Sequence, residues 1–226
     1  MAVQHSDEPA RLTYPASDIA PFHVEVPVAP AYLSSIRKRL LDIAIGSVGV
    51  LLLAVVFPFV ALAIKLNSPG PVSHHQRRMG RNGEPFELVK FRTMTVDAER
   101  AHGAVWARPN DPRVTTVGRY LRKLYIDEFP QWWTVLAGHM SVVGPRPKRP
   151  ELIGQILGFV PNFNRRLLAK PGITGLAQVN YRYTSTMMEA RNKLRHDVLY
   201  INAASLWLDI RLIMQTLRRV TMFKGM

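Results

Sequence analysis

The sequence predicts a mostly helical α+β fold in which one N-terminal membrane helix precedes a small folded domain with amphipathic helices and a short β-hairpin. Three observations lead to this prediction. No charged residue occurs from Ile43 to Ile64. Asn82-Gly83 precedes the alternating segment 86–91, a pattern typical of a hairpin turn and its second strand. Near the C-terminus, apolar residues recur at helical spacing between Leu206 and Val220.

The same features divide the chain into three parts. Residues 1–33 are rich in proline and lack apolar periodicity, so we expect a disordered tail. Residues 34–72 comprise a basic collar, the apolar run and a turn of proline and glycine. Residues 73–226 are soluble in character and long enough to bury one core.

Composition limits the chemistry and the partners. The chain has no cysteine, which excludes disulfides, thiolate metal sites and thiolate nucleophiles. Its formal net charge of +14 indicates an acidic partner, which could be nucleic acid, an anionic membrane surface or a phosphorylated small molecule. Nucleic acid fits least well, because it leaves the uncharged run unexplained and no base-reading motif is present.

The apolar run has two features that bear on how it meets the membrane. It is long enough for the roughly 20 residues that cross a bilayer as a helix, but Pro58 lies inside it. Basic residues flank it at 37–39 and at Lys65, so positive charge favours neither orientation. Hydropathy alone favours a spanning helix kinked at Pro58. A helix broken at Pro58 that returns to the same face would satisfy both basic flanks.

Two adjacent carboxylates are the strongest candidate for chemistry. Asp127 and Glu128 precede Pro130 and an apolar stretch that ends before Gly138. Proline is tolerated in a first helical turn and aspartate caps its amides, so the pattern predicts a helix that begins at the pair. A helix start also attracts phosphate. Taken alone, the pair is as consistent with capping as with metal binding or attack on phosphorus.

Cations accompany this pair in the sequence. Arg122 and Lys123 precede it, and Arg146 follows between two prolines that stiffen the backbone. Lys90 and Arg92 are two apart on the predicted strand and would share a face. There they could clamp a diphosphate or simply form a solvated edge.

Two downstream segments leave alternatives open. The glycine turn at 170–176 would offer free backbone amides, which is a weak signal for phosphate or nucleotide binding. The stripe at 206–220 fits an amphipathic basic helix on a membrane surface, and equally a core helix with a solvated face.

Together these residues resemble the bacterial sugar transferase family, the small monotopic phosphoglycosyl transferases. The resemblance extends from about Arg37 to Asp209. Its motifs are, in order, Ser68-Pro69-Gly70-Pro71, Gly80-Arg81-Asn82-Gly83, Lys90-Phe91-Arg92-Thr93-Met94, Asp111-Pro112-Arg113-Val114-Thr115, Asp127-Glu128 with Pro130-Gln131, Val143-Gly144-Pro145-Arg146-Pro147, and Lys170-Pro171-Gly172-Ile173-Thr174-Gly175-Leu176. Trp132-Trp133 departs from the family pattern, which has smaller apolar residues there.

The resemblance implies a catalytic domain at 73–226 that transfers a sugar-1-phosphate from a UDP-sugar to undecaprenyl phosphate, giving undecaprenyl-diphosphate-sugar and UMP. It implies Mg²⁺ as cofactor and the first membrane step of exopolysaccharide or other surface glycan synthesis. A homodimer and downstream glycosyltransferases are further partners that it suggests. The alternative is a catalytically inactive membrane scaffold, which the intact carboxylate pair does not support.

The resemblance also assigns places and roles. It implies the cytoplasmic face of the bacterial inner membrane, with both termini cytoplasmic and a re-entrant helix broken at Pro58, which reverses the preference from hydropathy. Asp127 would be the nucleophile, and Glu128 would complete the catalytic pair and hold Mg²⁺. The substrate-binding residues implied by the matched motifs are Lys90, Arg92, Arg122, Arg146, Pro147, Gly172 and Thr174.

Overall fold

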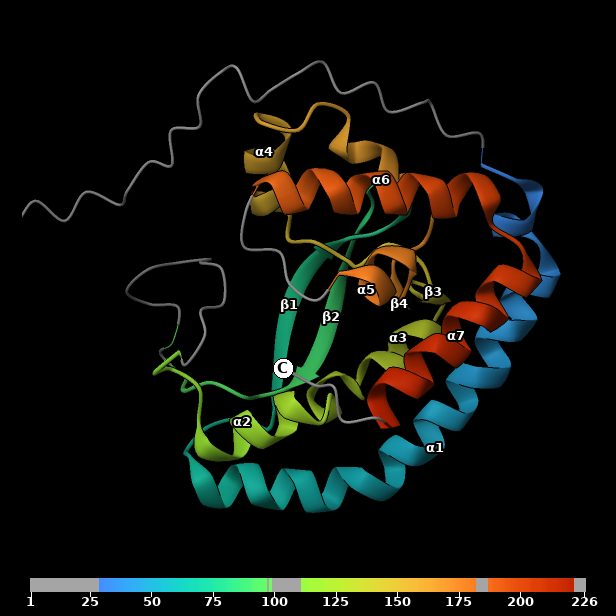
Figure 1. Ribbon diagram of the computed structural model, residues 1–226. Helices are drawn as coiled ribbons and strands as arrows, with labels where there is room; N and C mark the ends of the chain where they lie inside the picture. The colour runs from blue at the N-terminus through green and yellow to red at the C-terminus, as the bar shows by residue number, and fades with distance from the viewer. Residues whose placement is uncertain (1–28, 97, 99–110, 182–186, 222–226) are drawn as a thin grey trace, which may run out of the picture.

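A computed structural model describes residues 29–96, 98, 111–181 and 187–221 (Figure 1). The predicted tail lies outside the described residues up to position 28. The described elements are, in order, η2 (Ala31–Ser34), α1 (Ile36–Asn67), β1 (Ser73–Met79), η3 (Arg81–Gly83), β2 (Pro85–Phe91), α2 (Thr116–Lys123), η4 (Ile126–Glu128), α3 (Gln131–Leu136), β3 (Ser141–Val143), α4 (Pro150–Leu157), η5 (Phe163–Leu168), β4 (Gly172–Thr174), α5 (Leu176–Asn180), α6 (Met187–Ala203) and α7 (Leu206–Thr221), with η denoting 3-10 helices. The predicted class, mostly helical with a long apolar helix and a hairpin, is confirmed.

The helix α1 continues without interruption through the predicted break. The Ser35 side chain caps its start by accepting a hydrogen bond from the Lys38 backbone N–H. By length and composition the helix is apolar enough to cross a membrane. Pro58 removes one backbone donor inside it, and Figure 1 shows α1 changing direction between its two halves. The break predicted at Pro58 is therefore a bend in one continuous helix.

Both halves of α1 pack on the same folded domain. In the N-terminal half, Gly49 leaves room for Trp132 of α3, because a Cβ at Gly49 would lie 2.2 Å from the tryptophan ring. In the C-terminal half, Val60 and Ile64 are buried beside Leu121 of α2. The outer side of α1 remains exposed, and its large apolar residues there are Ile36, Leu40, Ile43, Val48, Leu51, Leu52, Val55, Phe57, Phe59, Leu62 and Leu66.

The strands β1 and β2 form the predicted antiparallel hairpin, with Arg78 opposite Phe86. Its turn requires a left-handed backbone at Asn82 (φ 57°), a conformation that asparagine tolerates. The C-terminal end of β2 contacts η4. The hairpin therefore brings Lys90 to the predicted carboxylate pair.

A second, two-stranded sheet replaces the predicted glycine turn. The strands β3 and β4 pair in parallel. The Gly172 N–H donates to the Pro145 carbonyl at 3.0 Å, and the Gly144 N–H donates to the Thr174 carbonyl at 2.8 Å. The prediction of free amides is therefore wrong for Gly172, since its N–H has a backbone acceptor. The pairing instead fixes the start of the loop that carries Arg146.

A buried polar network joins the start of α1 to α7 and β3. The Lys38 ammonium donates to Asp209 Oδ2 at 2.6 Å and to the Val143 carbonyl at 3.0 Å. The hydroxyls of Tyr32 and Tyr200 donate to the Asp209 carboxylate at 2.8 and 2.9 Å. Because Asp209 is fully buried, these donors replace water around its charge.

The basic collar is thus largely committed to folding. Besides Lys38, Arg39 donates to the carbonyls of Val135 and Leu136 at 2.9 and 2.6 Å, at the C-terminal end of α3. Only Arg37 of the three collar cations is exposed. The collar therefore carries less information about membrane orientation than its charge count suggests.

The helix α7 has one buried face and a second apolar face that is exposed. Leu212 is buried, and Ile213 packs against the core. Trp207 is 80% exposed. The other members of the predicted stripe also remain exposed, namely Leu206, Ile210, Leu217 and Val220. A merely solvated face would be polar, so this arrangement favours the membrane-surface interpretation of the helix.

Candidate active site

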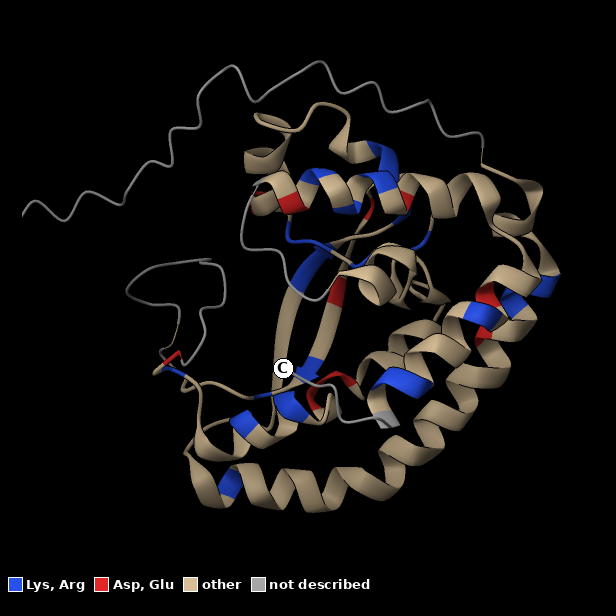
Figure 2. Cartoon of the chain, in the orientation of Figure 1, with Lys and Arg blue, Asp and Glu red and all other residues tan. Residues whose placement is uncertain are grey.

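Asp127 and Glu128 lie in η4, the 3-10 turn between α2 and α3, and Figure 2 shows this acidic turn beside the basic ends of β2 and α2. Tyr125, which directly precedes η4, has a left-handed backbone (φ 58°). The prediction that the pair begins and caps the following helix is wrong, because Pro130 occupies the capping position of α3 and no side chain caps it. The continuing 3-10 turn supplies carbonyl acceptors for the first N–H groups of α3.

Two cations hold Glu128. The Lys90 ammonium donates to its Oε1 at 2.7 Å, Arg146 donates from Nη1 to Oε2 at 3.3 Å, and Nη2 of Arg146 also donates to Oε1. The Glu128 side chain is 13% exposed. Burial by itself would raise its pKa, but the charges of Arg146 and Lys90 outweigh burial and hold the pKa well below its usual range. Glu128 is therefore a carboxylate fixed by cations.

Asp127 has the opposite environment. Burial raises its pKa to about 6, the Lys90 charge partly opposes that rise, and the negative charge of Glu128 adds to it. Within the described part of the chain, its carboxylate accepts no hydrogen bond. Two adjacent carboxyl groups thus have different surroundings, since Glu128 is held in ion pairs and Asp127 is buried with a raised pKa.

Arg122 lies close enough to this pair to act on Asp127, whereas Pro147 contacts β1. The Arg122 charge lowers the pKa of Asp127, and its Nε donates to the Thr93 hydroxyl at 2.8 Å. The Pro147 carbonyl accepts from Arg78 Nη1 at 3.2 Å, which connects the loop that carries Arg146, the arginine loop, to β1. Pro147 therefore positions the loop through its backbone.

Arg92 and Thr174 belong to the scaffold. Arg92 is buried and donates from Nη2 to the Ser68 carbonyl at 2.8 Å and from Nη1 to the Pro69 carbonyl. The predicted clamp of Lys90 and Arg92 is therefore not formed, because the two side chains bind different elements. The Thr174 hydroxyl forms a hydrogen bond with the hydroxyl of Thr216 in α7, with the two oxygens 2.6 Å apart.

A group of cations that the sequence did not predict surrounds Arg146. Arg78 of β1, Lys148 of the arginine loop, Arg166 of η5 and Lys193 of α6 affect one another as neighbouring positive charges. The two-residue spacing of Arg146 and Lys148 on a proline-stiffened segment could have indicated Lys148. Lys193 reaches the group only through the packing of α6.

A family model described as bacterial sugar transferase matches residues 33–223. The matched segment contains α1, the carboxylate pair and the cations around Arg146. The chain belongs to the bacterial sugar transferase family. This assignment confirms the resemblance inferred from the ordered motifs.

The sugar transferase also has curated relatives. An N-acetylgalactosaminephosphotransferase of Aeromonas hydrophila, named for UDP-N-acetylgalactosamine and undecaprenyl phosphate, is 39% identical over 191 residues, covering 84% of this chain and 45% of the relative. A UDP-glucose:undecaprenyl-phosphate glucose-1-phosphate transferase of Klebsiella pneumoniae is 40% identical over 208 residues, covering 88% and 43%. One of the same name from Caulobacter vibrioides is 40% identical over 189 residues, covering 83% and 70%. The chain therefore spans less than half the length of the first two relatives.

Proposed function

We propose that this sugar transferase moves a sugar-1-phosphate from a UDP-sugar to undecaprenyl phosphate and releases UMP. The observation that carries the proposal is the carboxylate pair, in which Lys90 and Arg146 hold Glu128 and leave Asp127 able to react. The names of the relatives, which are undecaprenyl-phosphate sugar phosphotransferases, support the substrate classes. The product, a lipid-linked sugar diphosphate, would be extended by downstream glycosyltransferases.

Two displacements account for the transfer. In the first, an Asp127 oxygen bonds to the phosphorus that carries the sugar, the P–O–P bond breaks, and its electron pair leaves with UMP. In the second, a phosphate oxygen of undecaprenyl phosphate attacks the same phosphorus, and the Asp127 carboxylate leaves. Lys90 and Arg146 lower the repulsion between the carboxylates and the diphosphate, since Glu128 is already neutralised.

The donor set of the pair fits Mg²⁺, which takes one or two carboxylates together with substrate phosphates. A carboxylate offers about four lone-pair sites. The N–H donors of Lys90 and Arg146 leave part of the Glu128 carboxylate available, next to Asp127. In the described segments, no group of three or more His, Cys, Asp or Glu residues could hold a metal alone, so substrate phosphates would complete the shell. When bound, Mg²⁺ would neutralise charge on the diphosphate.

The packing of α1 supports a re-entrant placement. A straight helix of its 32 residues would be about 48 Å long and would carry its ends past both sides of a hydrocarbon core about 30 Å thick. Both halves instead bend onto one domain. A re-entrant α1 keeps that domain on one side of the membrane, with the exposed apolar faces of α1 and α7 in the lipid. We assign that side to the cytoplasmic face of the bacterial inner membrane.

Re-entry predicts that both ends of the chain lie on the cytoplasmic side. Because the chain has no cysteine, single cysteines introduced as Ala2→Cys and Gly225→Cys report position without background. In intact cells a membrane-impermeant thiol reagent should label neither variant, and after permeabilisation it should label both. A cysteine in an established periplasmic protein serves as the positive control. Labelling of the first variant alone in intact cells would establish a spanning helix.

The function is tested with purified protein, Mg²⁺, undecaprenyl phosphate and a panel of UDP-sugars, scored by UMP release. We expect release with at least one donor and formation of a lipid-linked sugar diphosphate. If no donor on the panel is turned over by folded protein, the inactive scaffold becomes the better interpretation.

The raised pKa of Asp127 predicts the pH dependence of the first displacement. A carboxyl group with a pKa of about 6 is protonated below that pH and cannot attack phosphorus. The single-turnover rate of UMP release should therefore fall about tenfold per pH unit below pH 6 and level off above about pH 7. Rapid-quench measurements between pH 5 and pH 8 would check this, and a flat profile over that range would contradict it.

A further inference from the structure

The arginine loop comprises residues 144–149, between β3 and α4, and its backbone is irregular. Its backbone carbonyls from Gly144 to Lys148 nevertheless each accept a hydrogen bond from a distant element. In chain order, the acceptors and their donors are Gly144 and the Gln178 side-chain amide at 3.3 Å, Pro145 and the Gly172 N–H at 3.0 Å, Arg146 and Arg166 Nη2 at 2.7 Å, Pro147 and Arg78 Nη1 at 3.2 Å, and Lys148 and the Met79 N–H at 3.0 Å. A loop whose successive carbonyls are bound in this way presents its side chains in fixed places.

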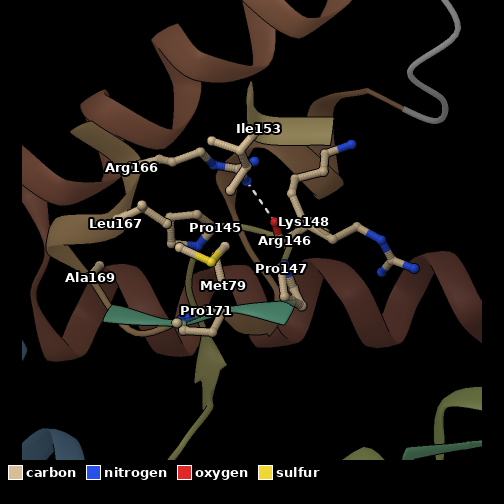
Figure 3. A pocket seen from close by; sticks show the side chains of 11 residues that line it. Met79, Pro145, Arg146, Pro147, Lys148, Ile153, Arg166, Leu167, Ala169 and Pro171 are labelled. Atoms are coloured by element: carbon tan, nitrogen blue, oxygen red, sulfur yellow. Dashed lines mark hydrogen bonds between the residues drawn. The ribbon is translucent and has the colours of Figure 1, made fainter. Parts of the chain in front are cut away.

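The donor to Arg146 is itself a buried arginine. Arg166, in η5, is 4% exposed. Figure 3 shows its guanidinium directed at the Arg146 carbonyl, while the side chain of Arg146 extends away from Arg166. The Arg146 side chain in turn donates from Nη1 to Glu128 Oε2 at 3.3 Å. Arg166 therefore holds the backbone from which the side chain of Arg146 extends to the carboxylate pair.

Three contacts fix the orientation of the Arg166 guanidinium. Besides binding the Arg146 carbonyl, its Nη2 lies 2.9 Å from Asp197 Oδ2 of α6, and its central carbon lies 4.9 Å from the centre of the Phe163 ring. The contact with Asp197 is an ion pair whose alignment falls short of a hydrogen bond. The aligned hydrogen bond of this nitrogen is the one to the arginine loop.

Stability alone is a weak explanation for this buried pair. Asp197 is 2% exposed, burial raises its pKa, and the charge of Arg166 opposes that rise. Removing two charges from water is costly, and neutral groups of similar volume often replace a buried ion pair without loss of stability. A charged donor does, however, make a stronger hydrogen bond to a carbonyl than a neutral one. The contact with the arginine loop therefore explains why a cation is placed here.

We propose that Arg166 is a positioning residue for the transfer reaction, because its hydrogen bond to the Arg146 carbonyl places the Arg146 guanidinium against Glu128. This inference rests on the proposed function, in which Arg146 lowers the charge repulsion beside Asp127. Such an effect depends on distance, and a displacement of about 1 Å can lower the rate of an enzyme about a hundredfold. Arg166 lies behind the loop and acts through Arg146.

Kinetic constants for UMP release test the proposal. Arg166→Met/Asp197→Asn removes the donor and neutralises both members of the ion pair, so the protein should fold. Its kcat should fall at least about tenfold and its KM for the donor should change less than about threefold, since Arg146 stabilises charge that develops as the P–O–P bond breaks. Arg195→Met is the matched control, because Arg195 is exposed on the same helix as Asp197, and it should have the kcat of the wild type.

A double-mutant cycle separates positioning from a structural role. In the Arg146→Gln background there is no guanidinium to position. Adding Arg166→Met/Asp197→Asn to that background should therefore lower kcat by less than about a further twofold. An equal loss of kcat in both backgrounds would show that the pair acts on the fold as a whole, and it would overturn the proposal.

Hydrogen exchange of the full-length protein without substrate provides a measurement that does not depend on turnover. Amides of residues 144–149 should exchange at least about tenfold faster in Arg166→Met/Asp197→Asn than in the wild type, while those of α1 should exchange at the wild-type rate. Arg166→Lys is the second variant if the first does not fold. It keeps a charge beside Asp197 but lacks the planar guanidinium, so loop exchange should rise and kcat should fall. Unchanged loop exchange in the folded variants would overturn the proposal.

These outcomes are distinguishable from failure of the proposed function. If UDP-sugars are turned over and kcat does not depend on Arg166, the positioning role is wrong and the transfer reaction stands. If loop exchange depends on Arg166 but the wild type turns over no UDP-sugar, Arg166 still positions Arg146 and the transfer reaction is wrong.

Discussion

Replacing Asp127 with asparagine should lower turnover of the sugar transferase by at least about a thousandfold, because the amide cannot form the ester with the sugar-bearing phosphate. The substitution preserves the shape of the side chain, so Lys90 and Arg146 should keep their contacts with Glu128. With the donor present and the acceptor absent, the wild type should release at most one equivalent of UMP per protein. Asp127→Asn should release none.

Two additional measurements make this result specific. Glu84→Gln removes an exposed carboxylate and should leave turnover unchanged. Mass spectrometry of the wild type quenched with donor alone should find the sugar phosphate on the peptide that contains Asp127. Equal turnover by Asp127→Asn, or an adduct on a different side chain, would remove Asp127 from the role of nucleophile.

Replacing Lys38 with methionine should destabilise the fold by about 3–5 kcal/mol, because the variant leaves the charge of Asp209 buried without its cation. The tyrosine hydroxyls donate hydrogen bonds to Asp209 but carry no charge to offset it. Lys38 also donates to the carbonyl of Val143, three residues before Arg146, so the loop should loosen as well. Chemical unfolding in detergent micelles measures the change.

The neighbouring residue provides a control for this prediction. Arg37→Met removes an exposed cation from the same collar and should cost less than about 0.5 kcal/mol. Lys38→Met/Asp209→Asn should recover part of the lost stability, because the amide can still accept hydrogen bonds and no unpaired charge remains. If Lys38→Met unfolds at the same denaturant concentration as Arg37→Met, the network does not stabilise the junction of α1 and α7.

Short sequence patterns correctly predicted the elements whose conformation depends on residues adjacent in the chain. The turn at Asn82-Gly83 and the alternating segment after it identified the hairpin. Residue types at neighbouring positions determine both a left-handed turn and the alternation of a strand. The uncharged run identified α1 for a similar reason. Hydropathy favoured a kink at Pro58 and the family resemblance a break, and contacts on both halves hold α1 together on either side of the bend.

Predictions of the contacts that a side chain or backbone group makes in the folded protein were less successful. Lys90 and Arg92 were expected to act together, but strand β2 ends at Phe91 and Arg92 turns to the carbonyls after α1. The segment that contains Gly172 was predicted to be a free turn. Its partner strand β3 was not recognised, because the two strands lie far apart in the sequence. A strand of three residues has too few positions to show periodicity, so only pairing reveals it.

The sequence by itself determined the long apolar helix, the hairpin, the adjacency of Asp127 and Glu128, and the family. These properties follow from residue type and spacing over short distances along the chain. Only the tertiary structure decided that Glu128 is held by cations while Asp127 is not, that Lys38 is a buried structural charge, and that the charge of Lys193 on α6 acts on Lys148. The reason is that burial and charge pairing depend on which distant segments pack together, and those interactions set the state of each ionisable group.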